Sequence, residues 1–364
     1  MPASSLARLA HRLVFAGFDG LTAPGETLAL VEEGLGGVVL FARNVASPQQ
    51  VAELNRSLKA SSAGPLLSCV DQEGGRVARL RAPWTEWPPM RKLGETGDEE
   101  LAEEVGRVLG TELKSCGFDL DFAPVLDVDS NPSNPIIGDR SFGRDAGLVA
   151  RMGAALVRGL QALRVAACGK HFPGHGDTAQ DSHLTLPRLP HGLTRLRKLE
   201  LVPFREAIGA GVQSLMTAHV VFEALDPGVP ATMSAKAVEG LLRRELGFSG
   251  VVFSDDLEMK AVHERFPLAE VVEQSLNAGV DGLLVCRDLK MQHAVVEHLV
   301  HAVEAGRVAR ARVEEAASRI DRLAAAYASE PARIDPLAAV RLAGLDRHRA
   351  IARRIARSNA GGPA

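Results

Sequence analysis

The sequence predicts an α/β protein built as a single (β/α)8 barrel of the TIM type, with a helical C-terminal tail. Three observations lead to this prediction: eight short apolar runs, amphipathic segments between them, and no strict polar–apolar alternation within the runs. Continuous Val, Leu and Ile runs are typical of strands buried on both faces, which favours a parallel sheet covered by helices. Eight strand–helix units over about 275 residues fit a barrel better than an open doubly wound sheet.

The predicted strands are short apolar runs that end in Gly or polar residues. In chain order they are 13–18, 37–41, 65–70, 118–125, 165–169, 214–217, 250–253 and 280–286. No G-x-G-x-x-G motif follows the first of these runs. Its absence argues against a dinucleotide-binding sheet, whose first strand normally leads into that turn.

Helical signals fill the segments between the runs. Over 98–114 a Leu or Val recurs every four residues, acidic residues occupy the first turn, and Gly117 follows as a left-handed cap. The segment 145–163 repeats the pattern, and 268–277 ends before Gly279. Amphipathic helices at these positions would cover the outside of the barrel.

Composition favours small-molecule chemistry. The 364 residues are 46% hydrophobic and 24% charged, with a net charge of −3, so no field of one sign is available for nucleic acid or an anionic membrane. The four cysteines form no C-x-x-C pair, and no apolar run approaches the roughly 20 residues that cross a bilayer. We expect a cytoplasmic monomer without metal or cofactor.

The domain organisation follows from where the strand–helix pattern ends. Residues 1–329 are predicted to form the barrel domain, and 330–364 an Arg/Ala-rich helical tail that is not a separate domain. An Arg-rich helix without interleaved aromatic residues is typical of a solvated surface helix rather than a nucleic-acid contact.

Acid–base groups gather at the predicted strand ends, which in a barrel share one mouth. The segment 170–183 holds a lysine, three histidines and two aspartates, with glycines that allow it to bend. Asp181 and His183 are two residues apart, so the carboxylate can orient the imidazole and leave its other nitrogen to exchange a proton. The pair is predicted to perform acid–base catalysis.

Asp255 follows the run 250–253 and is predicted to hold a carboxylate over the barrel mouth. Such a carboxylate can act as a nucleophile toward an anomeric carbon. Because adjacent residues leave a strand in opposite directions, we expect only one of Asp255 and Asp256 to face the mouth, the other serving as a helix cap.

A polar set at other strand ends is suited to hold a sugar by directional hydrogen bonds. Its members are Asp71, Arg79, Arg140, Lys170 and His171. Aromatic residues make up only 4% of the chain, which disfavours an open cleft lined with stacking platforms. The sequence therefore predicts a pocket for one terminal sugar.

These residues lie in motifs that resemble glycoside hydrolase family 3 β-N-acetylhexosaminidases, in particular the bacterial cytoplasmic enzymes that recycle cell-wall muropeptides. The matching stretches are DQEGGRV at 71–77, LDFAPVLDV at 120–128, GDRSF at 138–142, KHFPGHGDTAQDSH at 170–183 and FSDDLEM at 253–259. The likeness covers roughly residues 10–325.

The resemblance implies a retaining exo-β-N-acetylglucosaminidase that releases non-reducing terminal N-acetylglucosamine from muropeptide fragments. It implies that Asp255 is the nucleophile and that His183, assisted by Asp181, is the general acid/base. The polar set at the strand ends would bind the N-acetylglucosamine, and no metal is required.

Four other interpretations fit parts of the same pattern. A metal-dependent barrel hydrolase could use His171, His175, His183, His219 and Asp255 as ligands. A hexosaminidase could use the substrate's own acetamido group as nucleophile. A family 3 β-glycosidase of broader sugar specificity and a non-catalytic sugar-binding protein are the remaining two.

Overall fold

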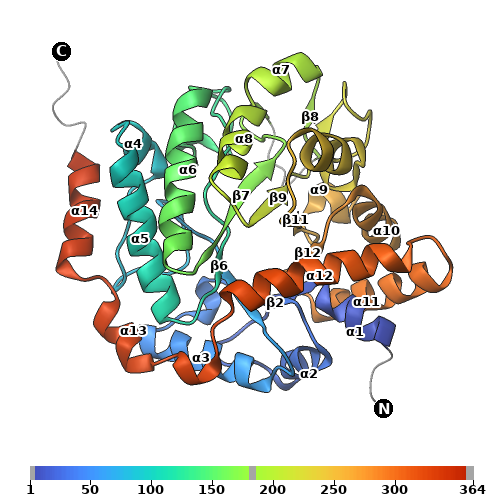
Figure 1. The fold of residues 1–364 in the computed structure, drawn as a ribbon, viewed down its shortest axis with the longest axis horizontal. Helices are drawn as coiled ribbons and strands as arrows, with labels where there is room; N and C mark the ends of the chain where they lie inside the picture. Colours follow the sequence, from blue (N-terminus) through green and yellow to red (C-terminus); the bar gives the residue numbers. More distant parts are fainter. Residues whose placement is uncertain (1–4, 180–185, 358–364) are drawn as a thin grey trace.

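The computed structural model describes residues 5–179 and 186–357, and its centre is a closed parallel barrel (Figure 1). The strands pair around the barrel in the order β1-β12-β11-β9-β7-β6-β3-β2. They are β1 (Val14–Ala16), β2 (Gly37–Leu40), β3 (Leu67–Val70), β6 (Leu120–Asp121), β7 (Ala166–Phe172), β9 (Ser214–Thr217), β11 (Val251–Asp256) and β12 (Gly282–Val285). The predicted (β/α)8 barrel is confirmed, with one barrel strand at each predicted run.

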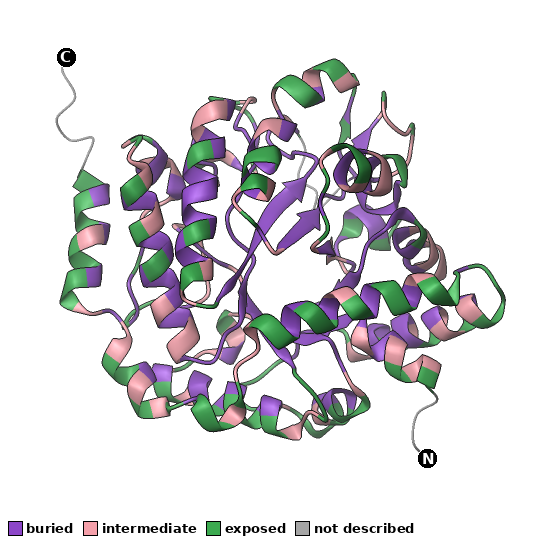
Figure 2. Cartoon of the chain, in the orientation of Figure 1, coloured by how far each residue is buried: buried purple, intermediate pink, exposed green. Residues whose placement is uncertain are grey.

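Helices surround the barrel, and their buried faces turn inward (Figures 1 and 2). The α-helices are α1 (Ser5–Arg12), α2 (Gly25–Glu33), α3 (Pro48–Ser61), α4 (Met90–Gly94), α5 (Glu99–Ser115), α6 (Ala146–Ala162), α7 (Leu193–Lys198), α8 (Leu201–Gly209), α9 (Lys260–His263), α10 (Leu268–Ala278), α11 (Leu289–Glu304), α12 (Arg310–Tyr327), α13 (Pro336–Leu342) and α14 (Asp346–Arg357). The chain also forms the 3-10 turns η1 (Ala42–Asn44), η2 (Gly138–Arg140), η3 (Ala231–Met233) and η5 (Pro331–Arg333), and the segment η4 (Lys236–Glu245) is a π-helix.

Local side-chain chemistry explains where several helices begin and end. Asp98 accepts a hydrogen bond from the Leu101 amide at the start of α5, and Asp145 accepts one from the Leu148 amide at the start of α6. These bonds satisfy amides that a helix leaves without partners. Gly279 ends α10 with φ of 110°, a conformation that favours glycine.

Two small sheets lie in the loops at the carboxyl ends of the barrel strands. β4 (Gln72–Gly74) pairs with β5 (Val77–Ala78) after β3, and β8 (Arg188–Leu189) pairs with β10 (Val221–Phe222). The β4–β5 hairpin brings the 71–79 segment back over the barrel mouth.

The fourth barrel strand is shorter than predicted, because regular pairing ends after Asp121 whereas the apolar run continues to residue 125. Pro124 has no amide proton to donate to a neighbouring strand. An isolated bridge between Val125 and Lys170 then resumes contact with β7.

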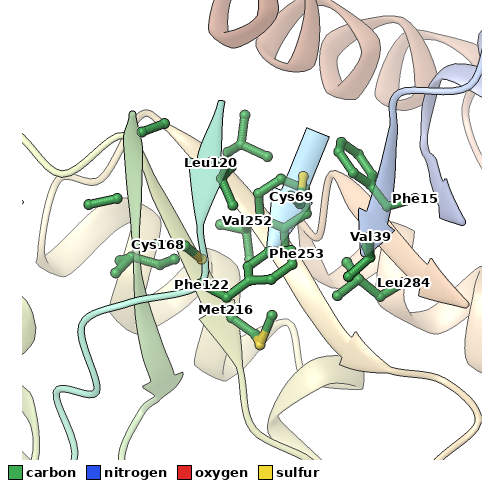
Figure 3. Packing of buried hydrophobic residues seen from close by; sticks show 14 of the residues in the cluster. Phe15, Val39, Cys69, Leu120, Phe122, Cys168, Met216, Val252, Phe253 and Leu284 are labelled. Atoms are coloured by element: carbon green, nitrogen blue, oxygen red, sulfur yellow. The ribbon is translucent and has the colours of Figure 1, made fainter. Parts of the chain in front are cut away.

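The inside of the barrel is closed by side chains (Figure 3). The ring of Phe253 meets Phe15 and Phe122 edge-on, with centroids 4.8 and 5.7 Å apart. Glycine is required beside these rings, since a Cβ at Gly37 would lie 2.5 Å from the Phe15 ring and one at Gly282 2.5 Å from the Phe253 ring. These closely packed rings form a rigid floor beneath the barrel mouth.

The C-terminal helices α13 and α14 run along the side of the barrel, with α14 beside α4 (Figure 1). The buried carboxylate of Glu112 in α5 holds this region by accepting bonds from the Gly344 amide and Thr85, and it lies 3.0 Å from Nδ1 of His348. The predicted helical tail is therefore present. Within residues 5–179 and 186–357, no helix is both long and apolar enough to cross a membrane.

Candidate active site

A cavity of about 200 Å³ opens above the barrel floor, at the carboxyl ends of the strands. Its lining combines an apolar floor with a ring of charged side chains. The lining residues are Val39, Phe41, Asp71, Glu73, Val77, Arg79, Phe122, Ile136, Arg140, Lys170, His171, His175, Met216, Asp255, Asp256, Met259, Leu284 and Cys286. A cavity of this size suits one small polar ring better than an extended chain, since pockets for larger ligands run to roughly 300–1,000 Å³.

Buried and partly buried ion pairs join four of the five predicted sugar-binding residues to one another and to Glu73. The Lys170 ammonium lies 2.7 Å from Oδ1 of Asp71 and 2.7 Å from Oε1 of Glu73. Arg79 donates to Oδ2 of Asp71 at 3.1 Å, and Arg140 makes two 2.8 Å bonds to Glu73. Three cations thus face two carboxylates, and we name these five residues the charge cluster.

The cations keep both carboxylates of the charge cluster ionised. Burial alone would raise the pKa of Glu73, but Arg140 and Lys170 hold it well below its usual range. Burial would likewise raise the pKa of Asp71, and Lys170 and Arg79 lower it instead. The cluster therefore offers fixed donors and acceptors to hydroxyl groups of a ligand.

Asp127 organises the turn that follows β7. Its carboxylate accepts bonds from the backbone amides of His171 and His175, and its Oδ2 lies 2.7 Å from Nδ1 of His171. Burial would raise the pKa of Asp127, but the His171 ring lowers it. Because a carboxylate accepts, Nδ1 of His171 carries the proton, and Nε2 is left for a partner on the other side of the ring.

Asp255 and Asp256 both line the cavity, so the expectation that only one of them would face it is wrong. The pairing of β11 with β12 shifts register between Phe253 and Asp256, which is an irregularity that redirects side chains at a strand end. The Asp256 amide donates to Oδ1 of Asp255 at 2.8 Å.

The carboxyl group of Asp255 is held in its ionised form. Burial alone would raise its pKa, but the His171 imidazole and the hydrogen bond from the Asp256 amide keep the pKa of Asp255 below its ordinary value. An ionised oxygen at the cavity wall is available as a nucleophile or as a stabiliser of positive charge.

The neighbouring Asp256 has the opposite property, because burial raises its pKa to about 7. A carboxyl group that titrates near 3.9 in the unfolded chain and near 7 in the fold stabilises the native state below pH 4, and this contribution is lost as pH rises through 7. We expect Asp256→Asn to raise Tm at pH 8 and to leave it nearly unchanged at pH 4. Thermal unfolding of both proteins across this range checks the sign, and equal gains at both pH values would contradict it.

Two of the predicted catalytic residues, Asp181 and His183, lie outside the described residues. A contact between Asp177 and His191 joins the chain before these two residues to the chain after them, with Oδ2 of Asp177 2.6 Å from Nε2 of His191. Oδ1 of Asp177 accepts a hydrogen bond from the Ser130 hydroxyl. The other predicted site residues all line the cavity: Asp71, Arg79, Arg140, Lys170, His171 and Asp255.

Histidine rings near the cavity are engaged by protein groups. Nδ1 of His175 lies 2.9 Å from Thr178, and burial lowers the pKa of His175 to about 4. His219 contacts Thr232 and the Asp256 carbonyl. Within the described ranges, which leave out 180–185, no group of three or more His, Cys, Asp or Glu residues could hold a metal ion.

Sequence reasoning missed Glu73 and Asp127 as members of the site. Both stood among the polar residues at strand ends, Glu73 within DQEGG and Asp127 two residues after the fourth run. The signal was therefore present, but a carboxylate that binds a protein cation is not distinguished by sequence from one that binds a ligand.

The chain is similar to proteins of known family, both in a family model and in individual sequences. The model of the glycosyl hydrolase family 3 N-terminal domain matches residues 23–323. A β-hexosaminidase of Nitrosomonas eutropha is 46% identical over 260 residues, which is 70% of this chain and 74% of the relative.

Solved structures agree with the sequence relatives. A family 3 β-N-acetylglucosaminidase from Paenibacillus sp. str. FPU-7 superposes with a TM-score of 0.91 at 43% identity, covering 97% of this chain and 68% of that one. NagZ from Neisseria gonorrhoeae in complex with N-trifluoroacetyl-D-glucosamine gives a TM-score of 0.73 at 35% identity, covering 86% and 98%.

Proposed function

Since the chain belongs to glycosyl hydrolase family 3, we infer that it is a β-N-acetylhexosaminidase, acting as a retaining exo-β-N-acetylglucosaminidase through a glycosyl–aspartyl intermediate. The observation that carries the inference is the ionised carboxylate of Asp255 beside a cavity ringed by the charge cluster. A small cavity closed below by apolar side chains supports attack on one terminal sugar rather than within a chain.

The charge cluster and His171 would hold the N-acetylglucosamine. Sugar hydroxyls both donate and accept, so paired carboxylates and cations can bind them in one fixed orientation. Lys170 donates two of its three N–H groups to Asp71 and Glu73, which leaves one for a ligand. Nε of Arg79 is buried and has no hydrogen-bond partner among the described residues, so it is a further candidate donor.

In the first step, an oxygen of Asp255 forms a bond to the anomeric carbon while the glycosidic C–O bond breaks. Protonated His183, oriented by Asp181, gives its proton to the departing oxygen. In the second step, His183 takes a proton from water, the water oxygen bonds to the anomeric carbon, and the ester to Asp255 breaks. The sugar leaves with its β-configuration retained.

We further propose cell-wall muropeptide fragments as the natural substrate, hydrolysed by a cytoplasmic monomer. The support is the likeness of the motifs at 71–77, 170–183 and 253–259 to the muropeptide-recycling enzymes. Hydrolysis of N-acetylglucosaminyl-anhydromuramic acid with and without its peptide, compared with chitobiose, tests the preference beyond the cleavage point.

The activity is tested with aryl β-glycosides of N-acetylglucosamine and of glucose, using the wild type and His183→Ala. We expect hydrolysis of the N-acetylglucosaminide only, a loss of activity in the variant, and no effect of a strong chelator. Comparable hydrolysis of the glucoside would favour a broader family 3 β-glycosidase. Inhibition by the chelator would favour a metal-dependent hydrolase, and no turnover of either substrate would favour a sugar-binding protein.

A further inference from the structure

We propose that His219 is a positioning residue for the nucleophile: its neutral imidazole fixes the backbone at Asp256, and that backbone fixes the carboxylate of Asp255. The role rests on the proposed function, because it is defined relative to the proposed nucleophile. His219 is fully buried, and its ring faces the end of β11 rather than the cavity lining.

The hydrogen bonds of His219 determine which nitrogen carries the proton. Nε2 lies 3.1 Å from the carbonyl oxygen of Asp256, and Nδ1 lies 2.8 Å from Oγ1 of Thr232. A carbonyl oxygen can only accept, so Nε2 must be the donor. In a neutral ring, Nδ1 can then accept a hydrogen bond from the Thr232 hydroxyl.

A second threonine completes this arrangement. Oγ1 of Thr217 lies 2.9 Å from Oγ1 of Thr232, and both side chains are fully buried. Thr217 can donate to Thr232 at 2.9 Å and Thr232 to His219 at 2.8 Å, which are shorter contacts than those of the same hydroxyls to the carbonyl oxygens of Phe253 at 3.3 Å and Ala218 at 3.2 Å. Burial also lowers the pKa of His219, which favours the same neutral ring.

The hydrogen bond from His219 to the Asp256 carbonyl lies where the pairing of β11 with β12 is irregular. The register between β11 and β12 shifts after Phe253 and resumes at Asp256. The Asp256 amide in turn donates to Oδ1 of Asp255 at 2.8 Å. His219 thus supplies a side-chain hydrogen bond where the strand departs from regular pairing, and the bond holds the residue whose amide orients the nucleophile.

The two variants His219→Leu and His219→Gln test this role. Leu removes both hydrogen bonds, whereas the Gln amide can still donate to the Asp256 carbonyl. We expect His219→Leu to lower kcat for an aryl N-acetylglucosaminide on the order of 10–100-fold with KM changed less than about threefold, since misplacement of a reacting group costs about that much. His219→Gln should recover most of kcat and keep the wild-type pH profile.

The leaving group separates this role from a defect in acid catalysis. The leaving group of a 2,4-dinitrophenyl glycoside departs without protonation. This substrate would therefore restore turnover in a variant that lacks the acid, but not in one whose nucleophile is misplaced. We therefore expect the His219→Leu defect to persist with this substrate. His348→Leu is the matched control: it removes another buried, hydrogen-bonded imidazole, in α14, and should lower Tm without changing kcat.

If His219→Leu does not fold, Thr232→Val carries the test. It removes only the hydroxyl that orients Nδ1, and kcat should fall several-fold at unchanged KM, whereas the buried control Thr27→Val should leave kcat unchanged. A wild-type kcat in folded His219→Leu would overturn the role of His219 and leave the proposed function untouched. Where His219→Leu does not fold, a wild-type kcat in Thr232→Val would have the same meaning. So would loss of a pH-profile limb in His219→Gln. A wild type inactive on the aryl N-acetylglucosaminide would overturn the proposed function and this role together.

Discussion

Asp255→Ala is expected to lower kcat for aryl N-acetylglucosaminides on the order of 10⁴-fold, which is the scale of losses when a catalytic carboxylate is removed. The expectation follows from the site, because Asp255 is the ionised carboxylate whose environment provides two nearby imidazoles and a backbone donor. Tm should fall at neutral pH, because a carboxyl group whose pKa is lowered in the fold stabilises the native state above its unfolded pKa, and because the Asp256 amide loses its acceptor. Steady-state kinetics and thermal unfolding of the same preparation check both parts.

Azide distinguishes loss of the nucleophile from general damage to the site. With the carboxylate gone, a small anion can reach the anomeric carbon from the same side, so azide should restore part of the activity with an activated substrate and yield the α-glycosyl azide. A fluorinated N-acetylglucosamine inactivator should label the wild type at residue 255, as read by mass spectrometry of peptides.

Asp256→Asn is the matched control for Asp255→Ala, because it changes the adjacent carboxyl group of the same strand end. It should retain turnover within about tenfold, whereas Asp255→Ala should not. The nucleophile assignment would be wrong if Asp255→Ala kept wild-type kcat. If the fluorinated sugar left residue 255 unlabelled, the acetamido group of the substrate would become the better candidate nucleophile.

The barrel could be predicted because its strands and the ends of its helices each leave a local signal in the sequence. The run 214–217 is apolar because β9 is buried on both faces, and the predicted boundaries agree with Ser214–Thr217. Asp98 and Gly279 mark helix ends through bonds and backbone angles set by the residues themselves. Where a local signal competes with pairing, as at Pro124, the predicted strand was too long.

The charge cluster could be predicted only in part, because its partners are far apart in sequence. Arg140 and Glu73 are brought together by the closure of the barrel, and nothing local to either residue encodes that pairing. The same holds for His219, which sequence reasoning considered as a metal ligand; the structure joins it to Thr232 and to the backbone of Asp256. The shift in register on β11 has no sequence signal that would have shown both aspartates facing the cavity.

Glu73→Gln is expected to be the most damaging single change within the charge cluster. Glu73 is 2% exposed and neutralises both Arg140 and Lys170 through the same oxygen, Oε1, at 2.8 and 2.7 Å. Removing its charge leaves three cations facing Asp71 alone. Breaking a buried ion pair at one partner costs about 3–5 kcal/mol, so the free energy of unfolding should fall by that amount.

The binding of sugar should weaken together with stability. Without the second carboxylate, the ammonium of Lys170 is repelled by Arg140 and loses the geometry that leaves one donor for a ligand. We expect the inhibition constant of N-acetylglucosamine to rise at least about tenfold, measured as competitive product inhibition. The control Glu103→Gln, which breaks only surface pairs with Arg107 and Arg158, should cost no more than about 1 kcal/mol. If Glu73→Gln behaved like that control, the charge cluster would be a surface-type ion-pair network and not the support of the sugar site.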